Sequence, residues 1–188
     1  MTPPDDTGPD ETGPDDTAPD DSGPDVVVRV GVTGHRELAD PDAVRRAVDD
    51  AVSALDDHGR RPLEVWSSLA DGADRVVARA VLARPRSRLV AVLPLEIDDY
   101  RADFDAAGAA ELDELVGLAH AVHVTGPDAG GTRESAYDRA GRMVVDGCDV
   151  LIAIWDGGPS GGRGGTADIV DVARAADRRT VVITADRR

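Results

Sequence analysis

The chain has 188 residues, of which 41% are hydrophobic, with a single cysteine and a formal net charge of −16. One cysteine excludes a disulfide within the chain, and no apolar stretch reaches the roughly 18 residues that a membrane helix needs. Because the N-terminus also lacks the basic and apolar regions of a signal peptide, we expect a cytoplasmic protein.

The first 25 residues are an acidic repeat in which variants of Thr-Gly-Pro-Asp-Asp recur. They carry nine acidic and no basic residues. Such a segment has almost no apolar surface to bury, so we expect residues 1–25 to be disordered, either as a solubility tail or as an acidic interaction arm. Residues 26–188 are long enough for one domain with a substantial core. All 21 basic residues are arginines, so no lysine is present to form a Schiff base.

From residue 26 onward, short apolar runs alternate with helical periodicity. The runs typical of strands are 26–32, 63–67, 88–93, 121–124, 150–155 and 180–184. The segments with an apolar face at helical spacing are 41–59, 73–83, 111–119, 134–145 and 167–176. The stretch 95–106 is polar, and we expect it to be irregular. Strands alternating with helices predict an α/β protein whose sheet has about six strands, mainly parallel, with right-handed crossovers.

The segment that follows the fifth expected strand carries the strongest functional signal. Six glycines stand between positions 157 and 165, and a helical pattern begins at Thr166. The first N–H groups of a helix have no partner within the helix and carry partial positive charge. Glycines let the backbone approach a phosphate closely. We therefore expect a site for a phosphorylated ligand, a nucleotide in the first place; the alternative is a flexible surface loop.

Ligands of parallel sheets bind beyond the carboxyl ends of the strands, so the other strand ends matter as well. Gly34, His35 and Arg36 follow the first expected strand and offer a tight turn and hydrogen-bond donors. Ser68 and Asp74 follow the second. Asp74 is explained equally well as a first-turn carboxylate favoured by the helix dipole.

Other candidate residues have a structural explanation beside the functional one. Trp155 would form a wall for a base or ribose, or belong to the core at the end of a strand. Cys148 begins a strand, which favours a buried structural thiol over a nucleophile. His120 and His123 flank a short strand, and the histidines lack metal-ligand spacing. We expect no metal and no cofactor.

Three motifs together resemble the SLOG superfamily, which includes the SMF/DprA proteins and the LOG phosphoribohydrolases. They are Gly34-His35-Arg36, the segment from Ser68 to Asp74, and the segment from Gly162 to Thr166. The resemblance covers residues 28–184 and implies a Rossmann-like three-layer sandwich that binds a nucleotide or an ADP-ribose-like derivative. Members of the superfamily include ligand sensors of bacterial conflict systems. The expected ligand-binding residues are Gly34, His35, Arg36, Ser68, Asp74, Trp155, Asp156, Gly162, Gly164, Gly165, Thr166 and Asp168.

The chain departs from the LOG enzymes at one position that matters for catalysis. Their glutamate for cleaving the N-glycosidic bond corresponds to Ile169 here, and Asp168 stands one residue earlier. One residue on a helix rotates a side chain by roughly 100°, so we expect a sensor module rather than a LOG-type hydrolase. Asp168 and Asp156 remain catalytic candidates for an N-glycosidic-bond enzyme, of the phosphoribohydrolase or deoxyribosyltransferase type.

Binding of single-stranded DNA, as in DprA, is a third possibility that the composition disfavours. The sequence pI is about 4.5, whereas nucleic-acid-binding domains are typically basic. A sensor without an effector domain implies a separately encoded effector or a homo-oligomer, and we expect no membrane partner.

Overall fold

The structure is a computed structural model that describes residues 26–159, 162 and 164–188. The described strands are β1 (Val28–Gly34), β2 (Leu63–Ser67), β3 (Arg88–Leu93), β4 (Ala121–Val124), β5 (Val150–Trp155) and β6 (Arg179–Thr184). The described helices are α1 (Pro41–Leu55), α2 (Ala73–Leu82), α3 (Ile97–Arg101), α4 (Ala106–Leu118), α5 (Arg133–Gly147) and α6 (Thr166–Ala175). The acidic repeat of residues 1–25, for which we expect disorder, lies outside the described residues, as does Arg163 of the third motif.

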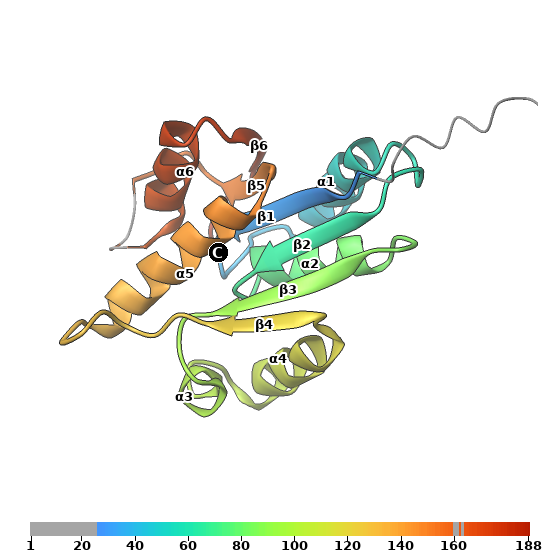
Figure 1. Cartoon of the computed structure of the whole chain (residues 1–188). Helices are drawn as coiled ribbons and strands as arrows, with labels where there is room; N and C mark the ends of the chain where they lie inside the picture. Colours follow the sequence, from blue (N-terminus) through green and yellow to red (C-terminus); the bar gives the residue numbers. More distant parts are fainter. Residues whose placement is uncertain (1–25, 160–161, 163) are drawn as a thin grey trace, which may run out of the picture.

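The six described strands form one sheet in the order β4-β3-β2-β1-β5-β6. Every pairing between neighbouring strands is parallel. Figure 1 shows α5 and α6 in front of the sheet and α1 and α2 behind it. The prediction of an α/β fold with a mainly parallel sheet of about six strands is therefore confirmed.

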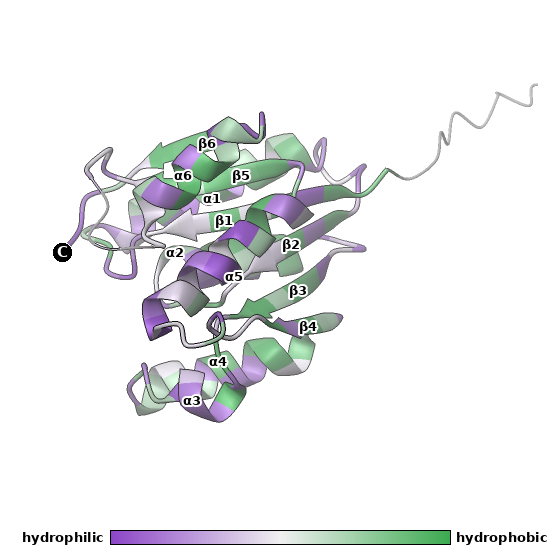
Figure 2. Ribbon diagram, turned by 60° about the vertical axis from the view of Figure 1, so that its left-hand side comes forward, coloured by the Kyte–Doolittle hydropathy of each residue, from purple (hydrophilic) through white to green (hydrophobic). Residues whose placement is uncertain are grey.

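The central strands β2, β3 and β5 are buried on both faces, which explains why they are nearly continuous apolar runs, whereas the edge strands β4 and β6 are partly exposed. A larger core joins the sheet to α1, α2 and α4, and a smaller one joins it to α5 and α6. Figure 2 shows the same division, with hydrophobic strands inside and hydrophilic residues on the outer face of α5. In the described part of the chain, no helix combines the length and the apolar character needed to span a membrane.

The stretch 95–106, expected to be irregular, contains α3 and the first residue of α4, and that expectation was wrong. Tyr100 is fully buried and packs edge-to-face on Phe104, with ring centroids 5.0 Å apart. The Asp105 side chain accepts the Gly108 N–H at 2.8 Å and caps α4. The alanine-rich start of α4 lacks a clear apolar face, so periodicity placed the start of this helix at residue 111 and missed its first five residues, which capping and intrinsic propensity support.

Most other boundaries agree with the sequence to within two residues. The exception is α1, which ends at Leu55 although the periodicity extended it to Gly59. Asp57 and His58 have positive φ angles of 50° and 55°, which stop the helix. Its start follows the sequence signal, because the Asp40 side chain accepts the Ala43 N–H ahead of Pro41.

Candidate functional site

A cavity of about 760 Å³ lies at the carboxyl edge of the sheet. The loops after β1, β2, β3 and β5 form its walls, together with the starts of α5 and α6 and the residues after β6. Nine of the twelve sequence-predicted residues line it: Gly34, His35, Arg36, Ser68, Asp74, Gly162, Gly164, Gly165 and Thr166. The structure thus brings the three motifs to one cavity.

Two glycines allow the loops after β1 and β2 to touch. The Ala73 N–H donates to the His35 carbonyl at 3.0 Å. A Cβ on Gly34 would lie 2.4 Å from the Cβ of Ala73, and one on Gly72 would lie 2.3 Å from the Arg36 carbonyl oxygen. Gly72 also has a φ of 73°, which favours glycine. The first two motifs are therefore one packed unit.

Asp74 belongs to this unit and lines the cavity. It is 6% exposed, and Ser67 Oγ donates to its carboxylate at 3.1 Å. Burial raises the pKa of Asp74 to about 6, although the hydrogen bonds from Ser67 and the Ala70 and Ser68 amides and the charge of Arg36 lower it. Asp74 thus holds the loop at the wall of the cavity.

The neighbouring Asp71 has a different environment. Its carboxylate pairs with the Arg75 guanidinium at 2.6 Å. Arg75 is itself buried and donates through Nε to the Leu69 carbonyl at 3.0 Å. Asp71 thus stabilises the loop through its ion pair with Arg75 and does not line the cavity.

Arg36 brings a positive charge to the cavity. Its guanidinium lies over the Tyr137 ring, 5.4 Å from the centroid, and no carboxylate of a described residue lies within 4 Å of it. The Tyr137 hydroxyl donates instead to Asp103, which also pairs with Arg133. Arg36 is therefore a stacked cation that forms no direct ion pair with a described carboxylate and acts on Asp74 over a longer distance, a favourable arrangement for an anionic ligand.

The N-terminus of α6 forms another part of the cavity wall. The Gly164 N–H donates to the Asp168 carboxylate at 3.1 Å, and the Gly165 N–H donates to the Gly162 carbonyl at 3.1 Å. Two of the amides expected to hold phosphate therefore serve the loop itself. No side chain of a described residue caps α6, so the N–H groups of its first turn, from Thr166 on, are the donors that remain.

Trp155, Asp156 and Asp168 do not line the cavity. The Trp155 indole N–H donates to the Gly158 carbonyl at 2.9 Å, and the Asp156 carboxylate accepts the Gly158 N–H at 2.8 Å. This amide, with smaller contributions from His35 and Arg187, holds the pKa of Asp156 below its usual value. All three predicted residues, including both catalytic candidates, bind their own loop in this structure.

His35 connects the glycine loop to the residues after β6. Its side chain is 3% exposed, and its Nδ1 accepts from Arg187 Nε at 3.2 Å. The Asp156 N–H points at its Nε2 with an N···N distance of 3.2 Å, and the Asp156 carboxylate lies 3.3 Å from the same nitrogen. Because an arginine always donates, His35 contacts Arg187 through Nδ1 and Asp156 through Nε2.

Several cavity residues were not predicted as site residues. They come from α3 and the turn after it, from α5 and α6, and from the residues after β6: Tyr100, Asp103, Arg133, Tyr137, Ile169, Arg187 and Arg188. The Tyr100 hydroxyl is buried without a hydrogen-bond partner among the described residues, and burial raises the pKa of Tyr100. The Ile169 side chain packs closely against Gly141, where an added Cβ would lie 2.4 Å from Ile169 Cδ1. The rule that ligands bind beyond the strand ends does not identify residues that reach the cavity from a helix crossing back over the sheet.

Comparison with known proteins supports the fold. No family model and no curated protein sequence matches the chain. DNA processing protein A (DprA) from Streptococcus pneumoniae is 19% identical, with a TM-score of 0.56 over 83% of this chain and 50% of that protein. DprA from Helicobacter pylori, solved for its single-stranded DNA binding mode, is 17% identical, with a TM-score of 0.55 over 82% and 64%.

The chain therefore spans between half and two thirds of the length of these two structures. At such identities the likeness shows the fold alone. It is the Rossmann-like fold of the group that the three motifs resemble, so that resemblance is confirmed at the level of the fold.

Proposed function

We propose that this chain binds a nucleotide-derived ligand of the ADP-ribose type and acts as a sensor. The premise of this proposal is the Rossmann-like fold of the chain, which is that of the SLOG superfamily. One observation carries the proposal: a single cavity is lined both by the stacked Arg36 cation and by the uncapped N-terminus of α6. Both features favour negative charge, and Asp74 in the same lining suits the hydroxyl groups of a ribose.

The volume of the cavity supports a small-molecule ligand. It is about 760 Å³, which falls in the range usual for such sites. The walls come from segments that follow five neighbouring strands of the sheet, β6, β5, β1, β2 and β3.

The hydrogen bonds of the loop support binding without cleavage. Asp156 and Asp168 use their carboxylates on the amides of Gly158 and Gly164. Ile169 is buried at the position where the LOG enzymes have glutamate. A carboxylate that already binds its own loop is poorly placed to assist departure of a base, so recognition is the function that these residues serve.

Calorimetry with ADP-ribose, NAD and AMP tests the proposal on the full chain. We expect ADP-ribose to bind the wild type, and Arg36→Gln to weaken binding by about tenfold or more, the loss of one charge-assisted hydrogen bond. Arg46→Gln, on the exposed side of α1, is the matched control and should leave binding unchanged. Absence of binding by all three compounds would refute the nucleotide site.

An enzyme that cleaves an N-glycosidic bond is the second candidate, and Asp74 favours it. A buried carboxyl group whose pKa is raised to about 6 inside a cavity is typical of a catalytic acid. Chromatography after long incubation with ADP-ribose separates the two functions. Free base or ribose phosphate that forms with the wild type, and not with Asp74→Asn, would establish the enzyme.

Binding of single-stranded DNA is a third candidate because DprA proteins share the fold. The net charge of −7 over residues 26–188 opposes it. A salt-sensitive mobility shift of a short single strand would establish it. The sensor function needs an effector or a second copy of the chain, so ligand-dependent changes in size-exclusion elution are expected.

A further inference from the structure

Residues 185–188, which we call the strap, bring two arginines to the cavity from beyond the last strand. The first N–H of the strap donates to the Trp155 carbonyl at 3.3 Å. Further along, Leu38 and Arg187 form an isolated antiparallel bridge beside the β1–α1 loop. These backbone contacts place Arg187 and Arg188 on the wall of the cavity.

The guanidinium of Arg187 is held from one side only. Its Nε donates to His35 Nδ1 at 3.2 Å and lies 3.8 Å from the Asp156 carboxylate. Its two terminal nitrogens make no hydrogen bond to a described residue, and the side chain is 50% exposed. Two parallel donors on an arginine suit two non-bridging oxygens of a phosphate.

The contacts of His35 hold the Arg187 side chain in position. His35 is buried, and its ring contacts two residues: Nε2 lies against the Asp156 amide and carboxylate, and Nδ1 accepts from Arg187. The same Asp156 carboxylate accepts the Gly158 amide at 2.8 Å. Asp156 thus links the glycine loop to the strap through His35, and this link fixes the position of Arg187 relative to the loop before α6.

We propose that Arg187 is a phosphate-binding residue of this cavity and that His35 is the positioning residue that aims it. The inference rests on the proposed function and narrows its ligand to a nucleotide-derived molecule with a phosphate or pyrophosphate group, such as the internal pyrophosphate of ADP-ribose. The oxygens of that group would be bound by the first-turn amides of α6 on one side and by Arg187 on the other.

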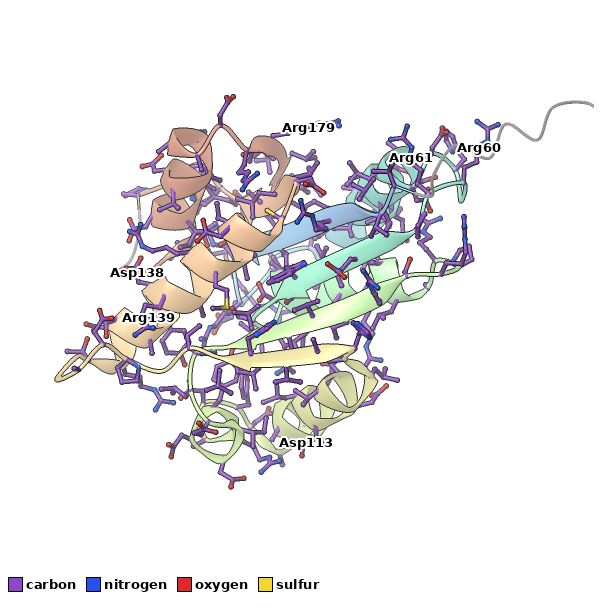
Figure 3. The ribbon with its side chains drawn as sticks, viewed as in Figure 1. Arg60, Arg61, Asp113, Asp138, Arg139 and Arg179 are labelled. Atoms are coloured by element: carbon purple, nitrogen blue, oxygen red, sulfur yellow. The ribbon has the colours of Figure 1, made fainter. Side chains whose placement is uncertain are left out.

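Calorimetric titration of the wild type and Arg187→Gln with ADP-ribose and with adenosine tests this assignment. We expect ADP-ribose to bind Arg187→Gln about 10- to 100-fold more weakly than the wild type, and adenosine to bind both alike. Arg179→Gln is the matched control: it makes the same charge change at the opposite end of β6, where Figure 3 shows Arg179 pointing away from the molecule. It should bind both compounds as the wild type does.

The outcomes distinguish this inference from the function on which it rests. A wild type that binds neither compound overturns the proposed function, and this inference with it. A wild type that binds ADP-ribose while Arg187→Gln binds it equally well overturns this inference alone. Equal weakening for adenosine also overturns it, because the loss would then be structural.

A double-mutant cycle tests the role of His35. We expect His35→Ala to weaken ADP-ribose binding in the wild type and to have little further effect in Arg187→Gln, since it acts through that arginine. Additive losses would overturn the positioning role. Arg187→Gln carries the main test even if the His35 variant does not fold, because Arg187 is half exposed.

Discussion

Replacing Asp74 with asparagine should change how the stability of the protein depends on pH. The carboxyl group is 6% exposed, and its pKa rises from 3.8 to about 6 on folding, chiefly through burial. Between pH 3.8 and about 6, the carboxyl group therefore keeps its proton in the native state and has lost it in the unfolded state. Since the folded pKa is raised, this contribution to stability is present below pH 4 and is lost as the pH rises through 6.

The difference between the two pKa values corresponds to about 3 kcal/mol of unfolding free energy at neutral pH. About 2 kcal/mol of this should be lost between pH 4.5 and 7.5. An asparagine side chain has nearly the same shape as the protonated carboxyl group and does not titrate. Over this range the stability of Asp74→Asn should therefore rise by about 2 kcal/mol relative to the wild type.

Urea unfolding of both proteins at several pH values measures this difference directly. The comparison cancels the titration of the many other carboxylates. A difference between wild type and variant that stays constant from pH 4.5 to 7.5 would refute the reasoning, because the group would then titrate alike in the folded and unfolded states.

Two further substitutions test the packing of the site. Gly72→Ala should lower the free energy of unfolding by about 2 to 4 kcal/mol, because of the positive φ of Gly72 and the clash with the Arg36 carbonyl. Urea midpoints measure this loss. The control is Gly117→Ala on α4, which has open space around it and should be neutral or slightly stabilising. Ile169→Glu should cost about 3 kcal/mol, because it buries a carboxylate against Gly141, and chromatography should detect no cleavage of ADP-ribose. Gain of cleavage by Ile169→Glu would show that the missing glutamate alone separates this site from the LOG enzymes.

The sequence predicted the sheet better than the helices at one end of it. Strands such as β5 are unbroken apolar runs bounded by polar residues, so their limits agree with the structure to the residue. Helix α3 is a single short turn fixed by the burial of Tyr100, and such tertiary contacts leave little periodicity to detect.

The cavity was predicted only where its residues follow a strand. The loops after β1, β2 and β5 reach it by the general rule for parallel sheets, and they supplied most of the predicted residues. Tyr137 reaches it because α5 crosses back over the sheet, and Arg187 because the strap folds beside the β1–α1 loop. The sequence also did not reveal that Asp156 and Asp168 bind their own loop, since the same residue type serves a ligand equally well.

The order of the strands has a consequence for how the cavity is assembled during folding. Strand β1 pairs with β2, its neighbour in sequence, and with β5, which follows more than a hundred residues later. The contact between His35 and Arg187 spans 152 residues. Closing such long loops is slow and entropically costly, so the cavity is complete only after the last strands have docked. Ligand binding should therefore report on the folding of the whole domain, and a chain that stops before β5 should show none.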